Sequence, residues 1–142
     1  MFFDRAAALG DRPRYRHHRD GEWRDVSWTT MATRVRQIAA ALIDMGVTPG
    51  DRIALLSGTR AEWMEVDFAI LSTGALTIPI YPSVLAAECG YILNNAGATM
   101  AFVENAAQRA KVVSARDDGV ALDGVVQRSP IRAIVTIDDD AS

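Results

Sequence analysis

The residues best suited to bind an anion are Ser-Gly-Thr at positions 57–59, which follow an apolar run and precede a helical pattern. Backbone N–H groups at a strand-to-helix junction can hold a phosphate or a carboxylate. A phosphate loop of the form GxxxxGK[ST] needs more glycines and a lysine, whereas Arg-Ala-Glu follows here at 60–62. We therefore interpret the loop as an ordinary turn. Trp63 and Phe68 could line an apolar pocket, but their helical spacing favours core packing.

Other chemically active side chains lack the neighbours that catalysis or metal binding requires. His17 and His18 are adjacent on an expected strand and so point to opposite faces. Cys89 falls on the inner face of an expected helix, which indicates a small core residue rather than a nucleophile. The Asp run at 138–140 could bind a cation, although a solvated chain end explains it better. GxGxxG, GxSxG and HExxH are absent, so spacing and chemistry alone predict no active site.

The first part of the chain predicts two helices flanking a hairpin. Asp20-Gly21 favours a type I′ turn, because both residues accept positive φ. Ser27 or Thr29 can cap the second helix, and Gly46 can end it. Apolar residues recur along one face of that helix: Met31, Val35, Ile38, Leu42 and Met45. The expected elements are helices at 2–9 and 30–45 and strands at 14–19 and 22–26.

The remainder alternates between helical and strand patterns, which indicates a mostly parallel sheet covered by helices. Pro79 lacks an N–H group, so the strand that carries it should be short or lie at an edge. Expected strands are residues 52–57, 75–81, 99–104 and 131–137, and expected helices are 60–73, 86–95 and 105–115, with Asn105 as a cap. The buried helix at 60–73 presents Trp63, Val66, Phe68, Ile70 and Leu71, and the next helix has Leu85, Cys89, Ile92, Leu93 and Ala96 on its inner face. A turn is expected at 117–119.

Composition limits the class of protein. The chain has 142 residues, 49% of them hydrophobic and 23% charged, with a net charge of -3. This balance argues against a nucleic-acid or anionic-membrane surface. One cysteine excludes an internal disulfide, and we find no apolar run of membrane-spanning length and no signal-peptide pattern. These observations predict a cytoplasmic protein of one domain. Lys111 is the sole lysine.

Three groups of segments together resemble the opening of the adenylate-forming superfamily, which includes acyl-CoA synthetases, luciferases and peptide-synthetase adenylation domains. LIDMGVTPGDRIA at 42–54 is similar to an LxxxGVxPGDRVA element of that family. The Glu62-Trp63 pair and Pro79 to Pro82 look most like the long-chain fatty-acid–CoA ligase branch. The matching segments, in order, are 26–28 with 42–54, then 57–63, 67–71 and 74–75, and finally 78–83, 91–98 and 101–104.

The resemblance implies the N-terminal part of an α/β synthetase, with the chain at 1–142 forming a partial subdomain of the large domain. The intact enzyme would use ATP, Mg²⁺ and CoA to convert a fatty acid, or another carboxylic acid, to an acyl-adenylate and then to a thioester. The family's SGTTGxPKG phosphate loop, its adenine- and ribose-binding motifs and its C-terminal lid with the catalytic lysine have no counterpart in this chain. We therefore assign no catalytic, cofactor-binding or metal residue, and expect a fragment that is inactive alone and binds none of the cofactors. Gly46, Pro49, Gly50 and Asp51 match the family pattern and should shape a turn.

Two other interpretations remain open. The chain could be a stand-alone, non-catalytic α/β binding or interaction module derived from this family. It could also be a small flavodoxin-like domain, which would bind a nucleotide or flavin at the carboxyl ends of its strands. The fragment interpretation adds one expectation: apolar surface left exposed could lead to self-association.

Overall fold

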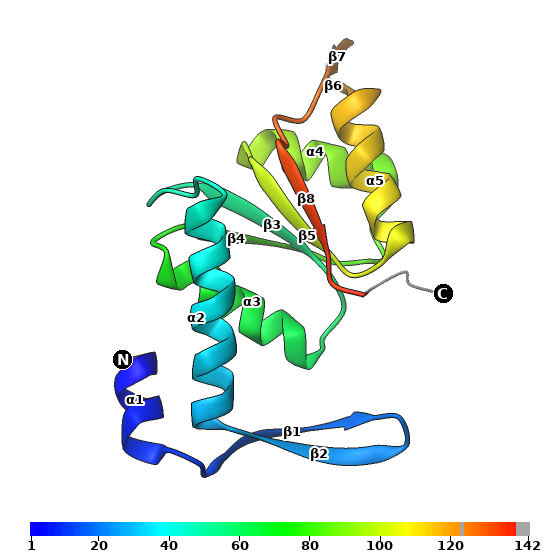
Figure 1. The fold of residues 1–142 in the computed structure, drawn as a ribbon. Helices are drawn as coiled ribbons and strands as arrows, with labels where there is room; N and C mark the ends of the chain where they lie inside the picture. The colour runs from blue at the N-terminus through cyan, green and yellow to red at the C-terminus, as the bar shows by residue number, and fades with distance from the viewer. Residues whose placement is uncertain (123, 139–142) are drawn as a thin grey trace.

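A four-stranded parallel sheet forms the centre of the computed structural model, which describes residues 1–122 and 124–138. Its order is β4-β3-β5-β8 (Figure 1). The two inner strands are apolar on both faces, as a strand covered by helices on each side must be. The predicted alternation of helices and strands is confirmed. The strands are β3 (Arg52–Leu56), β4 (Leu76–Ile80), β5 (Met100–Val103) and β8 (Ala133–Thr136).

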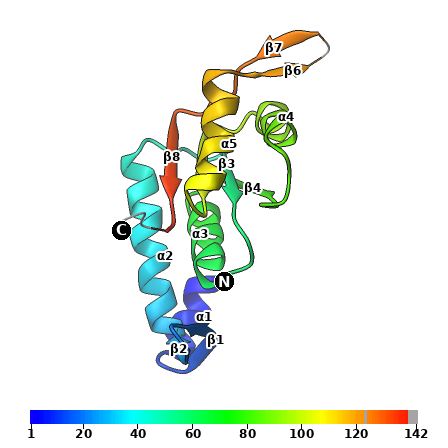
Figure 2. The same ribbon diagram turned by 90° about the vertical axis from the view of Figure 1, so that its right-hand side faces the viewer.

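Two helices cover each face of the sheet (Figure 2). Ile53 and Leu55 of β3 point to the face packed by α2 and α3, while Ala54 and Leu56 point to the face packed by α4 and α5. Cys89 is buried in the core between the sheet and helices α4 and α5, as predicted. The four helices are α2 (Trp28–Asp44), α3 (Ala61–Ser72), α4 (Ala86–Ala96) and α5 (Ala106–Asp117).

The N-terminal helix and hairpin pack against one end of α2 and α3. Asp20 and Gly21 both have positive φ, at 53° and 80°, which confirms the predicted turn chemistry. Phe68 of α3 stacks on Phe2 with ring centroids 4.5 Å apart, so it is a core residue as expected. The elements here are α1 (Phe2–Leu9), β1 (Pro13–Arg19) and β2 (Glu22–Ser27).

Helix caps and turns agree with the sequence. The Ser27 hydroxyl accepts a hydrogen bond from the Thr30 N–H, and the Asn105 side chain accepts one from the Gln108 N–H. The Asp51 carboxylate accepts a 2.8 Å bond from the Thr48 N–H, within the predicted turn. Gly46 precedes this turn and Gly50 lies within it, with φ of 81° and 90°. These two glycines therefore serve backbone geometry.

Three predicted inward-facing residues are exposed. Met45 (40% exposed) caps the C-terminus of α2, Leu71 (50%) lies on the outer side of α3, and Leu85 (70%) precedes the first turn of α4. Helical spacing identifies a face only while the chain remains helical, so it misplaces residues at the two caps. For Leu71, the sequence analysis expected apolar residues around a wide arc of α3 to be buried, but neighbouring elements cover only part of that arc.

The sequence also missed a hairpin, β6 (Val120–Leu122) paired with β7 (Val125–Gln127). Only a turn at 117–119 was predicted for this region. Three-residue strands give too few positions for an alternating pattern to appear. Val125 and Val126 are both exposed, at 61% and 63%, and the hairpin projects beyond α5 (Figure 2). It is therefore an appendage rather than part of the sheet.

Candidate functional site

The loop at residues 57–59 lies where an open parallel sheet most often binds ligands. The strand that follows β3 in the chain, β4, lies on one side of β3, whereas β5 and β8 lie on its other side. The direction in which strands are added to the sheet therefore reverses between β3 and β5. The carboxyl ends of strands at such a reversal form a crevice. Glu104, directly after β5, fills it: its Oε2 accepts a 2.7 Å bond from the Gly58 N–H and lies 3.3 Å from the Ser57 hydroxyl.

This internal carboxylate explains why the loop is an ordinary turn. It takes the backbone donor that a phosphate would need, as the weak sequence signal suggested. The flavodoxin-like interpretation requires an anion at this same crevice, and the site already holds one negative charge. Sequence analysis overlooked Glu104, although a carboxylate placed immediately after a buried strand, level with the 57–59 loop, is a readable signal.

Replacing Glu104 with alanine should destabilise the chain by about 1–2 kcal/mol, because a charge-assisted hydrogen bond is lost at a partly buried N–H group. Glu104→Gln should lose less, since an amide oxygen can still accept from Gly58. Urea unfolding of both variants measures the difference. If both variants lose the same free energy of unfolding, Glu104 does not stabilise the chain through its hydrogen bond to Gly58.

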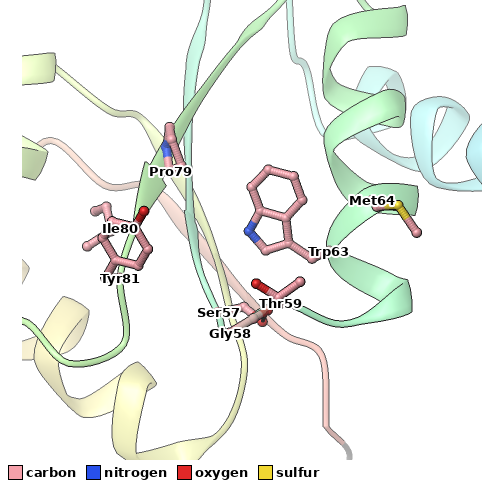
Figure 3. Close-up of a pocket in the computed structure, with 8 residues that line it drawn as sticks. All are labelled: Ser57, Gly58, Thr59, Trp63, Met64, Pro79, Ile80 and Tyr81. Carbon is pink, nitrogen blue, oxygen red and sulfur yellow. Dashed lines mark hydrogen bonds between the residues drawn. The ribbon is translucent and has the colours of Figure 1, made fainter. Parts of the chain in front are cut away.

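An apolar cleft of about 460 Å³ opens beside this loop. Trp63 of α3 faces Pro79, Ile80 and Tyr81 at the end of β4, with the 57–59 loop closing one end (Figure 3). Trp63 also packs on the core between α3 and the sheet. Trp63 therefore both lines the cleft and packs in the core, whereas Phe68 belongs to the core alone. The eight lining residues, which also include Met64, carry no charge.

A second, polar hollow adjoins the first through Thr59 and is lined by both histidines. Its charges are paired: Glu62 accepts from Arg60 at 2.9 Å and lies 3.5 Å from Arg19. Asp138 bonds to Arg60 at 2.7 Å, so its role is an ion pair. Residues 139 and 140 of the Asp run lie outside the described residues. Among the residues described, no three His, Cys, Asp or Glu side chains are grouped to hold a metal ion.

Cys89 and Lys111 have structural surroundings. Burial raises the pKa of the Cys89 thiol, and the nearby Lys111 charge opposes this only in part. A buried protonated thiol is a poor nucleophile. The Lys111 ammonium donates to the carbonyl oxygens of Pro82 and Val84 at 2.7 and 2.8 Å. The sole lysine thus holds the loop between β4 and α4.

A buried carboxylate joins the N-terminal hairpin to two helices. Glu65 of α3 is 5% exposed and accepts from the Tyr15 hydroxyl at 2.6 Å and from Arg34 at 2.8 Å. Burial, followed by the hydrogen bond and charge of Glu65, raises the pKa of Tyr15 above its usual range. The phenol therefore holds its proton more tightly when the chain is folded.

Stability should fall at alkaline pH because of Tyr15. An unfolded tyrosine titrates near pH 10, and the folded pKa is higher, so the contribution is complete below about pH 10 and is lost as pH rises toward the folded value. Thermal unfolding at a series of pH values should show this decline. Tyr15→Phe should flatten the alkaline slope, whereas Tyr81→Phe, at an 80% exposed position, should leave it unchanged. Identical slopes for Tyr15→Phe and the unaltered chain would contradict the assignment.

The chain matches the AMP-binding enzyme family over residues 2–141. It is 38% identical over 108 residues to the long-chain-fatty-acid–CoA ligase FadD15 of Mycobacterium bovis, covering 76% of this chain and 18% of the ligase. It is also 30% identical over 79 residues to an uncharacterized protein of Mycobacterium tuberculosis, covering 56% of this chain and 45% of that protein. The chain thus spans about a fifth of the length of the ligase.

Solved structures share the fold. The N-terminal domain of FACL13 from Mycobacterium tuberculosis superposes with a TM-score of 0.80 at 19% identity, covering 96% of this chain and 33% of that one. A putative long-chain-fatty-acid CoA ligase from Rhodopseudomonas palustris gives a TM-score of 0.76 at 22% identity, covering 99% of this chain and 33% of that one.

In the described part of the chain, no helix has the length and apolar character needed to cross a bilayer.

Proposed function

The chain belongs to the AMP-binding enzyme family, and from this premise we propose that it is the N-terminal segment of a fatty-acid–CoA ligase. The family match over nearly the whole chain carries the proposal. The parent enzyme would activate a fatty acid with ATP and Mg²⁺ to an acyl-adenylate, and CoA would then displace AMP to give the thioester. Such an enzyme would act in lipid metabolism, and the single cysteine fits a reducing compartment such as the cytoplasm.

The contribution of this segment within the enzyme is structural. It supplies four parallel strands covered on both faces, with caps and turns that need no ligand. Its switch-point crevice holds Glu104 rather than an open anion site. Since no catalytic residue can be assigned here, we infer that the segment alone does not activate a carboxylic acid. ATP, Mg²⁺ and CoA would be bound by other parts of a longer polypeptide.

Fatty-acid-dependent ATP–pyrophosphate exchange tests the proposal. It should be measured on this chain and on the natural gene product that continues through an SGTTGxPKG-like loop. Exchange by the longer product alone is the expected result, and the acid that supports it identifies the substrate. If the longer product exchanges pyrophosphate with no carboxylic acid tested, the synthetase proposal fails. Exchange by the 142-residue chain would reveal an ATP site within these residues.

A second candidate is a stand-alone, non-catalytic module derived from the family. One observation favours it: 79 aligned residues make up 45% of the uncharacterized mycobacterial relative, whereas 108 make up only 18% of the ligase. That relative is therefore a much shorter protein than the ligase. Sequencing the natural transcript past codon 142 separates the two candidates. A stop codon there supports the module, and an open frame into the phosphate loop supports the ligase.

A further inference from the structure

The loop between β4 and α4, residues 82–85, is held by a side chain from a helix far along the chain. The loop lies outside the strand pairs of the sheet, and Pro82 has no N–H group to donate. The Lys111 ammonium on α5 donates to the carbonyl oxygens of Pro82 and Val84 at 2.7 and 2.8 Å. Because a charged donor makes the stronger kind of hydrogen bond, these two bonds tie the loop to α5.

The residue type at position 111 suits these contacts. All but one of the 15 basic residues are arginine, and Lys111 is the exception. An ammonium is a compact charge with three donors on one atom, whereas a guanidinium is a planar fork. The carbonyl oxygens of Pro82 and Val84 converge on a single nitrogen, which is the geometry that an ammonium satisfies.

Tyr81 connects the 82–85 loop to the apolar cleft. Its side chain lines the cleft on the wall opposite Trp63 (Figure 3), and the loop begins at the next residue of the chain. The Tyr81 carbonyl oxygen also accepts a 3.2 Å bond from the Val84 N–H. The loop that Lys111 holds therefore supports this wall of the cleft.

A second border of the cleft is held from the same part of the chain. Glu104, which directly follows β5, accepts the hydrogen bond from Gly58 in the 57–59 loop. Glu104 and Lys111 are not among the described residues that line the cleft, so each acts through the loop that it holds. The cleft itself lies at the carboxyl ends of β3 and β4, where open parallel sheets bind ligands.

We propose that Lys111 is a positioning residue: through the 82–85 loop it holds the Tyr81 wall of the cleft in the place that the ligase reaction requires. This inference deepens the proposed function and rests on it. The contacts that carry it lie inside the chain, between α5 and the loop, and do not depend on what covers the outer surface. Without the ammonium the loop should open more often, while the sheet stays intact.

Hydrogen exchange followed by mass spectrometry tests the loop in Lys111→Met. The N–H groups of Val84 and Leu85 are bonded within the turn and its helix cap, and they should exchange roughly tenfold faster or more once two bonds from a charged donor are lost. The amides of β3 report global unfolding and should keep their rates. Arg116→Met is the matched control, because it removes a positive charge from the same helix and its partner is the adjacent Asp117.

Restoring the ammonium should restore the loop. Lys111→Cys provides a thiol that 2-bromoethylamine alkylates, giving a side chain with an ammonium at nearly the length of lysine. Cys89 is fully buried, so the reagent should act at position 111, and the unaltered chain treated in the same way controls for this. Exchange at Val84 and Leu85 should be fast before alkylation and return to the unaltered rate after it.

The longer gene product tests the role in the reaction. In fatty-acid-dependent pyrophosphate exchange, Lys111→Met should raise KM for the acid roughly threefold or more and change kcat less, since a binding wall is displaced. Unchanged loop exchange in Lys111→Met, no recovery after alkylation, or an unchanged KM would each overturn the inference. If no carboxylic acid supports exchange by the longer product, the proposed function fails, and the loop measurements still decide whether Lys111 holds the loop.

Discussion

Replacing Arg34 with methionine should destabilise the folded chain by about 2–4 kcal/mol, because it leaves the Glu65 carboxylate buried without its cation. Glu65 is 5% exposed and has two side-chain partners, Arg34 at 2.8 Å and the Tyr15 hydroxyl at 2.6 Å. The Arg34 side chain is itself 46% exposed, which keeps the expected loss below that of a fully buried pair. Urea unfolding monitored by circular dichroism measures the loss.

Removing the whole network should cost less than breaking it. Arg34→Met combined with Glu65→Leu and Tyr15→Phe replaces every polar partner with an apolar one, so no buried charge remains. This triple variant should recover most of the stability lost in Arg34→Met. Arg5→Met, at an exposed site on α1, controls for the loss of one positive charge. A triple variant less stable than Arg34→Met would show that the polar network itself stabilises the fold.

Glu65 illustrates what the sequence could not predict. A glutamate in a helical pattern is normally assigned to a solvated face, and only tertiary contact shows that hairpin and helices converge on it. Tyr15 and Arg34 lie 50 and 31 residues from Glu65 along the chain. No local pattern links residues at such separations. The elements themselves were predictable, because strands such as β5 are short apolar runs bounded by turn and cap residues.

The candidate site likewise has features that the sequence predicts and features that only the tertiary structure reveals. The weakness of the 57–59 loop as a phosphate site was evident from its residues, since the lysine and additional glycines are missing. That Glu104 fills the crevice follows from strand order, which alternation alone does not fix. The cleft between Trp63 and Tyr81 likewise required the placement of α3 against β4. Local chemistry was thus predictable, and the pairing of distant segments was not.

Gly90 occupies a position where the backbone of α4 approaches the start of β6 closely. It lies in mid-helix, where glycine is unfavourable by about 1 kcal/mol relative to alanine, so packing must explain its presence. A Cβ at this position would overlap the Val120 side chain and lie 3.3 Å from the Ala115 Cβ. Val120 is β-branched and cannot easily rotate away. The absent side chain therefore allows α4, α5 and β6 to meet.

Gly90→Ala should consequently destabilise the chain by about 2–3 kcal/mol despite its better helix propensity, since overpacking outweighs the gain. Adding Val120→Ala removes the overlapping methyl groups. The double variant should be more stable than Gly90→Ala, with a coupling energy of about 1–2 kcal/mol in a double-mutant cycle. Gly97→Ala tests a different effect, because that glycine has φ of 63° and a Cβ there would make only ordinary contact with the Arg52 side chain, so Val120→Ala should not rescue it. If Gly90→Ala is neutral or stabilising, the hairpin moves aside freely and the close approach is not a constraint on the fold.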